Sequence, residues 1–276
     1  MTDSSRYTIS SHVSGCSARR IGCGALGFVN ARARRAVVRL EDVDRRRFLD
    51  TTRGVGALAC AERADNWSLR GEVLSSMANQ AVWTGRPDDG LTLAEQGLVR
   101  PDRLTAAARA RLHTDRGRAL AKMRRCDEAL TAVGTADDHF AHLIPDNEPP
   151  FLAYYDDSSH ALLTGYPLAD LAILGHNPGE ATGRLAAAAT GHTAGKTRAQ
   201  TIRLTKLASL TMATVDPLQA ATIGHAALDA AGAVRSRRVA EELRELARCA
   251  ASHEHLDQVA HLRQRIGTLL RRTDSP

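Results

Sequence analysis

The sequence predicts an all-α protein, a right-handed helical-repeat solenoid of about five helix pairs that follows a poorly ordered basic segment. Composition is the first observation, since alanine accounts for 47 of the 276 residues and aromatic residues for only 4%. Alanine favours helices, whereas strands favour β-branched and aromatic side chains. The other two observations are a recurring unit of nearly constant length and a series of proline and glycine stops between apolar helical stretches.

The N-terminal part of the chain is basic and lacks a helical period. Residues 1–60 contain 11 Arg, no Lys and 5 acidic residues, so they carry the whole formal net charge of +6. We expect residues 1–42 to form a flexible basic segment and residues 43–67 a linker with a short helix. Within this part, short helices are predicted around Ala31–Leu40 and Asp44–Thr52.

A helical-repeat domain is predicted over residues 68–272. Its recurring unit is marked by a small or apolar residue that opens a helix after a turn. The markers are separated by 39, 52, 39 and 39 residues, and they are Gly90, Ala129, Ala181, Ala220 and Val259. A period of this size is typical of a solenoid in which each unit consists of two antiparallel helices.

Each unit is expected to contain a first and a second helix. The first helices are predicted at about 68–84, 102–123, 151–164, 197–214 and 235–251. The second helices are predicted at about 88–99, 127–140, 178–189, 216–231 and 255–271, with a further helix near Pro167–Leu174. Glycine ends a helix and proline suits the first helical position, as in Gly85-Arg86-Pro87, Asn177-Pro178-Gly179 and Asp216-Pro217.

Four segments are informative beyond their helical pattern, namely Asp216–Arg248, Phe151–Asp157 (FLAYYDD), Thr205–Ala208 (TKLA) and Val43–Leu49 (VDRRRFL). They are similar to segments of actinobacterial Cro/repressor-type (XRE-family) transcriptional regulators, and the resemblance covers residues 43–272. In that family a helix-turn-helix domain precedes a tetratricopeptide-like sensor region. The resemblance implies a tetratricopeptide-like sensor or interaction region here. Residues 1–42 show no two-helix apolar pattern, so we expect this chain to lack the helix-turn-helix domain.

The predicted architecture suggests where a ligand binds. Stacked helix pairs curve, and the first helices line the concave surface, where such arrays take peptides or proteins. We therefore expect a non-enzymatic interaction or ligand-sensing module that binds a peptide, a small molecule or a partner protein there. The candidate contact residues are Asn79, Gln80, Trp83, Arg116, Tyr154, Tyr155, His160, Arg203 and Lys206. For the aromatic residues among them, the alternative interpretation is that they pack in the core.

A second hypothesis is a DNA-binding regulator that uses its basic N-terminal segment. Arg32, Arg34, Arg35 and Arg39 lie within one predicted helix and would contact phosphates. Residues 61–276 hold 26 basic and 26 acidic side chains, so the predicted helical body itself carries no basic excess.

Other function classes find little support. The sequence contains no G-x-S-x-G, H-E-x-x-H or paired-carboxylate pattern, so no enzymatic activity is predicted. Its five cysteines are scattered without a C-x-x-C pair, and we expect no metal, no cofactor and a cytoplasmic location. No apolar run reaches the length of a membrane span, so no membrane partner is expected. Homodimerisation stays open.

Overall fold

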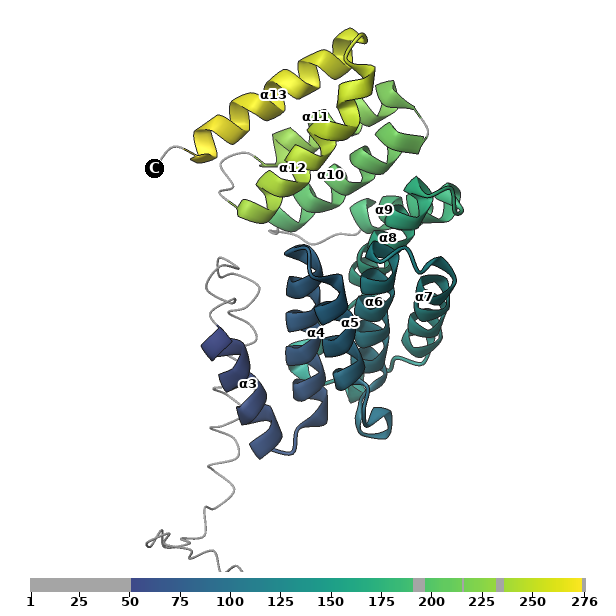
Figure 1. The fold of residues 1–276 in the computed structure, drawn as a ribbon, viewed down its shortest axis with the longest axis vertical. Coiled ribbons are helices and arrows are strands. Elements are labelled where there is room, and N and C mark those ends of the chain that lie inside the picture. The colour runs from purple at the N-terminus through teal and green to yellow at the C-terminus, as the bar shows by residue number, and fades with distance from the viewer. Residues whose placement is uncertain (1–50, 191–196, 215, 232–235, 275–276) are drawn as a thin grey trace, which may run out of the picture.

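The computed structural model describes residues 51–190, 197–214, 216–231 and 236–274 (Figure 1). All regular elements in these ranges are helices, which confirms the all-α prediction for the described residues. None of the helices described is long and apolar enough to cross a membrane. The α-helices are α3 (Thr51–Arg63), α4 (Trp67–Trp83), α5 (Pro87–Gly97), α6 (Ala106–Lys122), α7 (Cys126–Ala141), α8 (Asp157–Ile173), α9 (Pro178–Thr190), α10 (Thr197–Thr214), α11 (Pro217–Ala231), α12 (Arg237–Cys249) and α13 (Asp257–Asp274).

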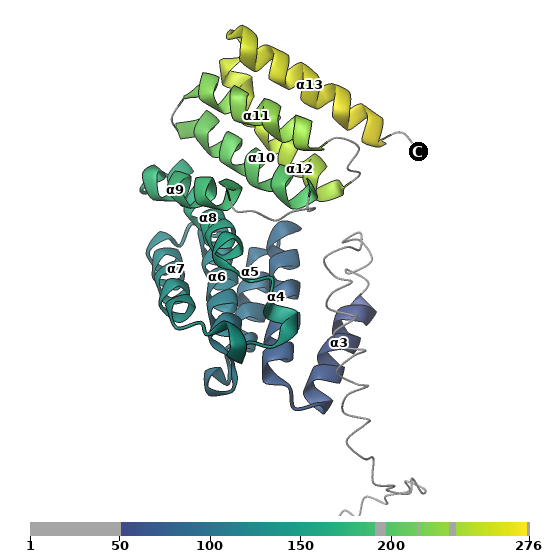
Figure 2. The ribbon, with the colours of Figure 1, turned by 180° about the vertical axis from the view of Figure 1, so that it is seen from behind.

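Consecutive helices pack in pairs, and each pair contacts the next. The pairs are α4/α5, α6/α7, α8/α9, α10/α11 and α12/α13, and α3 packs along α4. We call α4, α6, α8, α10 and α12 the first helices and their partners the second helices. Each first helix also packs against the next first helix, from α4 to α12. The helices α4 to α7 run along the long axis of the molecule, whereas α10 to α13 cross it obliquely (Figures 1 and 2).

Local signals in the sequence account for most helix ends. The side chain of Asn66 accepts a hydrogen bond from the backbone N–H of Leu69 (2.9 Å), which satisfies a free donor at the start of α4. Gly85 has a φ of 83°, a left-handed conformation that glycine adopts without strain, and it separates α4 from α5. Pro87 then occupies the first position of α5, where its missing N–H costs nothing.

Three predicted boundaries need correction. Helix α6 begins at Ala106 and not near 102, because Pro101–Arg103 forms a 3-10 turn and Thr105 caps the helix. The predictions of separate helices at 151–164 and Pro167–Leu174 were wrong, since one helix, α8, spans Asp157–Ile173 with Pro167 inside it. The segment before α8 instead contains two further 3-10 turns, Pro145–Asn147 and Pro150–Leu152.

Packing explains why α8 continues past its proline. A proline inside a helix removes one backbone hydrogen bond, which favours a break. Here Tyr166, Leu168 and Leu171 beside Pro167 are almost fully buried against neighbouring helices. Burial of these side chains offsets the lost hydrogen bond, so tertiary contacts override the local signal.

Other N-terminal predictions concern residues outside the described ranges. The flexible segment 1–42, the helix around Ala31–Leu40 and most of the one around Asp44–Thr52 fall there. In the described part of the linker, α3 is a 13-residue helix, longer than the short one expected.

The core lies both within and between the helix pairs and depends on small side chains. All five marker residues of the recurring unit are buried, and Ala129, Ala181, Ala220 and Val259 are 0% exposed. At Gly117 on α6, an added Cβ would lie 3.3 Å from the carbonyl oxygen of Ala129 on α7. Small residues at these crossings therefore let the two helices of a pair approach closely.

Gly90 at the α4–α5 crossing supplies a test of this close approach. An added Cβ there would lie 2.5 Å from Cγ2 of Val82 and 3.0 Å from the backbone oxygen of Ala78. Because Val82 is β-branched and backbone oxygens cannot move aside cheaply, Gly90→Ala is expected to lower the free energy of unfolding by about 1–3 kcal/mol. Urea unfolding followed by circular dichroism at 222 nm measures this.

The matched control is Gly134→Ala in α7. An added Cβ at Gly134 has no heavy atom within 4 Å, so this variant is expected to gain about 1 kcal/mol from helix propensity alone. If the two variants were equally stable, the close packing of α4 on α5 would be refuted.

Candidate functional site

Polar side chains are buried along the first helices and nowhere else in the described residues. All eighteen buried polar or charged side chains belong to them: five on α4, four on α6, two on α8, six on α10 and one on α12. Where the structure describes their side chains, the second helices bury apolar residues and glycine only. Burial of a polar group is costly unless it is paired, so the partners of these side chains decide what this face can do.

At the N-terminal end, Asp115 of α6 organises a buried polar cluster. Its carboxylate accepts hydrogen bonds from Ser75 Oγ (2.5 Å) and Asn79 Nδ2 (3.3 Å) on α4. The guanidinium of Arg111 lies 3.9 Å from Asp115, and Arg118 Nη1 donates to Asn79 Oδ1 (3.0 Å). Burial opposes the charge of Arg111, but Asp115, together with Glu72 and the nearby tyrosines, outweighs this effect, so the pKa of Arg111 is raised.

A second chain of hydrogen bonds joins α6, α7, α8 and α9. The Tyr155 hydroxyl lies 3.2 Å from Thr114 Oγ1 and 2.8 Å from His160 Nδ1, and His160 Nε2 lies 2.8 Å from Asp137 Oδ1. Arg184 donates two hydrogen bonds of 2.7 Å to the same carboxylate. Burial raises the pKa of Tyr155, so its phenol keeps its proton at neutral pH.

The carboxylate in this series of hydrogen bonds, that of Asp137, stays ionised. Burial works to raise the pKa of Asp137, but hydrogen bonds from Arg184 and His160 outweigh it and lower the pKa to about 2. The phenol of Tyr155 and the carboxylate of Asp137, which Arg184 and His160 hold, tie α6, α7, α8 and α9 together.

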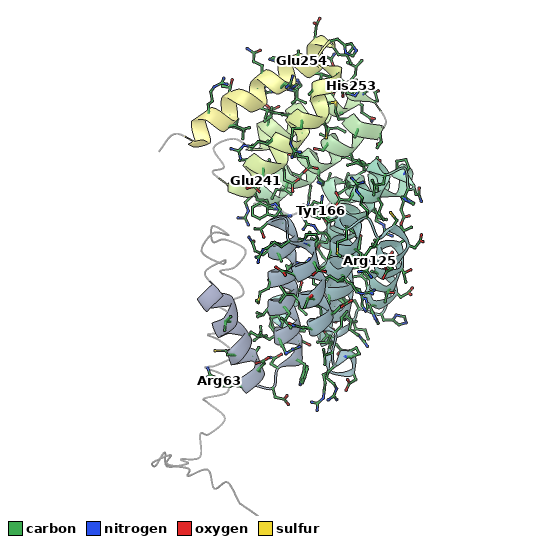
Figure 3. All side chains as sticks on the ribbon, viewed as in Figure 1. Arg63, Arg125, Tyr166, Glu241, His253 and Glu254 are labelled. Atoms are coloured by element: carbon green, nitrogen blue, oxygen red, sulfur yellow. The ribbon has the colours of Figure 1, made fainter. Side chains whose placement is uncertain are left out.

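Three cationic side chains surround the ring of one buried tyrosine. Tyr166 of α8 is 1% exposed. The guanidinium carbon of Arg118 lies 4.7 Å from the ring centre, that of Arg238 lies 5.6 Å from it, and Lys206 Nζ lies 5.7 Å from it. Arg238 Nη2 also donates to the Tyr166 hydroxyl (3.0 Å). We call these four residues the Tyr166 cation cluster, and Figure 3 places Tyr166 where α4–α7 meet α10–α13.

The cluster draws one residue from each of α6, α8, α10 and α12, so it links four successive first helices. Lys206 is paired with Glu242 (3.7 Å) and Glu245 (3.3 Å) of α12. Burial disfavours its charge, but Glu242 and further carboxylates outweigh that effect, so the pKa of Lys206 is raised. Each cation–π contact stabilises the arrangement by about 0.5–2 kcal/mol.

The predicted contact residues are mostly interior. Six of the nine are buried, with exposed fractions from 2% for Tyr155 to 7% for His160 and Lys206. Asn79 and Lys206 belong to the clusters described above, and Tyr155 and His160 bond to each other. Because these six side chains are buried, any ligand would reach them only through their exposed neighbours.

The structure does not bring the other predicted residues into one group. Arg116 turns towards the second helix α5, where its Nε lies 3.3 Å from Glu95, and Trp83 lies at the end of α4. Tyr154 and Tyr155 precede α8 and do not lie on a first helix as expected, because Asp156 caps that helix. Of the remaining two, Gln80 is buried on α4 and Arg203 is buried on α10.

The sequence analysis did not select several residues of the buried polar clusters. Two of the contacts in these clusters nevertheless follow the 39-residue period. Asn79 contacts Arg118, and Lys206 contacts Glu245, and both pairs are 39 residues apart. In both pairs the separation equals the spacing of 39 residues between marker residues, and both contacts join two first helices. No period marked Tyr166, because the sequence analysis placed it in a gap between the helices predicted at 151–164 and Pro167–Leu174. The residues missed are Asp115, Arg118, Tyr166, Arg238 and Glu242.

The described residues contain no group of three or more His, Cys, Asp and Glu side chains that is arranged to hold a metal ion. The four N-terminal arginines of the DNA hypothesis, Arg32, Arg34, Arg35 and Arg39, lie outside the residues described. Comparison of the chain with family models, with curated proteins and with solved structures gave no match in any of the three.

Proposed function

We propose that this protein is a non-enzymatic, tetratricopeptide-like helical-repeat module that binds a protein, a peptide or a small molecule on the face formed by its first helices. The succession of helix pairs from α4 to α13 supports a repeat array, because each pair packs on the next in chain order. The resemblance of residues 43–272 to regulator sensor regions supports a sensing role, so we also propose a kinship with those regulators.

One observation carries the proposal: the confinement of buried polar side chains to the first helices. A stack built only for stability would gain more from apolar residues at these positions, since a buried polar group at best recovers its lost hydration. The first helices keep ionic groups there instead. Side chains that can switch between internal partners and a ligand suit a face that recognises polar ligands.

The partly exposed residues along this face give a ligand access to it. Trp83, Tyr154 and Arg238 are neither buried nor fully exposed. Tyr154 donates from its hydroxyl to Glu72 of α4 (2.7 Å), so an aromatic edge and a carboxylate lie together. Such amphipathic aromatic side chains are frequent at binding surfaces.

The test is selection of binding peptides from a displayed random library with the full chain as the target. Selected peptides are expected to lose about tenfold or more in affinity for the Trp83→Ala or Tyr154→Ala variant, because both positions border the first-helix face. Thr131→Ala and Thr222→Ala, at exposed positions on the second helices α7 and α11, serve as matched controls. Peptides that respond to the control variants and not to the first-helix variants would refute the proposal.

DNA binding remains the second candidate function, and the concentration of 11 Arg in residues 1–60 is what favours it. A titration of the full chain with duplex DNA at rising salt tests this candidate. The hypothesis expects affinity to fall steeply with salt, and replacement of Arg32, Arg34, Arg35 and Arg39 by Gln to flatten that dependence. Equal affinity of the two proteins at every salt concentration would exclude the role of these arginines.

A further inference from the structure

The Tyr166 cation cluster contains more positive charge than the described chain neutralises at close range. Lys206 has two carboxylate partners, Glu242 and Glu245. Within the ranges that the structure describes, Arg118 and Arg238 form no ion pair. The hydrogen-bond partner of Arg118 is a neutral one, the side-chain oxygen of Asn79 at 3.0 Å.

Both arginines also keep a buried donor unused. The Nε atoms of Arg118 and of Arg238 are shielded from solvent and have no hydrogen-bond partner in the described structure. Arg118 is only 6% exposed, so water does not compensate its charge. A guanidinium buried in this way is unfavourable unless an anion accompanies it.

More distant carboxylates reduce the excess positive charge around Tyr166 without neutralising it. Asp170 and Glu242 favour the charged form of Arg118, but Asp170 is bonded to Lys122 (2.8 Å) and Glu242 is paired with Lys206. Burial and the neighbouring charge of Arg238 dominate, and together they lower the pKa of Arg118. The two guanidinium groups are thus close enough to repel each other.

We infer that Arg118 and Arg238, beside Tyr166, form a binding site for the oxyanion group of a small ligand, either a phosphate or a carboxylate. The planar fork of arginine donors matches both groups, and a charge-assisted pair is strongest away from water. Arg238 is partly exposed, so the anion would enter from its side and reach Arg118 behind it. This inference rests on the proposed binding function and names the ligand chemistry for its first-helix face.

The experiment measures thermal unfolding and isothermal titration of the full chain with inorganic phosphate, O-phosphoserine and citrate, each against chloride at constant ionic strength. At least one of these anions is expected to raise the unfolding midpoint with rising concentration. A response to inorganic phosphate identifies a free-phosphate site. A response confined to phosphoserine or to citrate identifies an organic phosphate or a carboxylate ligand.

Variants separate specific binding from general charge effects. Arg118→Gln and Arg238→Gln are each expected to weaken anion affinity about tenfold or more, because each removes a charged donor. Arg116→Gln, two residues before Arg118 on the same helix but paired with Glu95, is the matched control and should bind like the wild type. Arg238→Lys keeps the positive charge but lacks the planar set of guanidinium donors, so its anion affinity is expected to lie between those of the wild type and Arg238→Gln.

The unliganded proteins give a second readout. Without anion, Arg118→Gln is expected to unfold close to the wild-type midpoint, because removal of a buried charge that lacks a carboxylate partner offsets the lost contacts with Tyr166 and Asn79. The inference is overturned if none of the three anions raises the midpoint above that in chloride, or if Arg116→Gln weakens binding as much as Arg118→Gln does. If peptides bind the first-helix face but no anion raises the unfolding midpoint, the anion site is refuted. The proposed binding function would still be supported in that case.

Discussion

Asp115→Ala is expected to lower the free energy of unfolding by about 3–5 kcal/mol, the largest effect of any single substitution considered for this protein. Asp115 is 1% exposed and accepts hydrogen bonds from Ser75 and Asn79. It also supplies the carboxylate nearest to the buried guanidinium of Arg111. Its removal leaves only Glu72 and the nearby tyrosines to compensate that charge, and it takes an acceptor from Ser75 and Asn79. Urea unfolding of the full chain measures the loss.

Two further variants test this explanation. Asp115→Asn keeps an acceptor oxygen but not the charge, so its cost is expected to lie between those of the wild type and Asp115→Ala. Asp138→Ala replaces an exposed carboxylate on α7 and should stay within about 0.5 kcal/mol of the wild type. A loss below about 1 kcal/mol for Asp115→Ala would mean that the cluster contributes little to the packing of α4 on α6.

Leu262→Ala in α13 is expected to cost about 2–5 kcal/mol, because it removes a fully buried side chain from the largest core cluster. Leu262 is 0% exposed, and its Cδ2 would lie 2.7 Å from a Cβ added at Gly224 of α11. It also shares the cluster with Leu246 of α12, so it joins the last three helices. Truncation leaves a cavity that these helices can close only in part.

Thermal and urea unfolding of the Leu262→Ala variant measure that cost. Leu218→Ala on α11 is the control, since Leu218 is 45% exposed and its truncation should change stability by no more than about 0.5 kcal/mol. Equal stability of the two variants would show that α13 does not depend on its contacts with α11 and α12.

The helix boundaries were predictable where local chemistry decided them. Helix α10 spans Thr197–Thr214, as expected, and α4, α5, α7, α9 and α11 begin and end within a few residues of their predicted ranges. Gly85, with its positive φ, and the prolines that open α5 and α11 act through their own backbone, so their effect is visible in the sequence alone.

Boundaries that depended on distant contacts were not predictable in this way. Pro167 signals a helix break, but the burial of Tyr166 and Leu168 carries α8 through it. The candidate site shows the same limit. Asn79, His160 and Lys206 were selected as solvent-facing ligands, and packing places all three in the interior.

Sequence alone was enough to predict a helical protein, the places where most helices start and stop, and small or apolar marker residues that recur at a spacing of 39 residues in three of four intervals. These properties follow from backbone chemistry and from periodicity within one segment of chain. The folded arrangement was needed to show which polar side chains are buried, and that Arg118, Lys206 and Arg238 surround Tyr166. The physical reason is that desolvation and charge pairing depend on residues brought together from four different helices, and no local pattern contains that information.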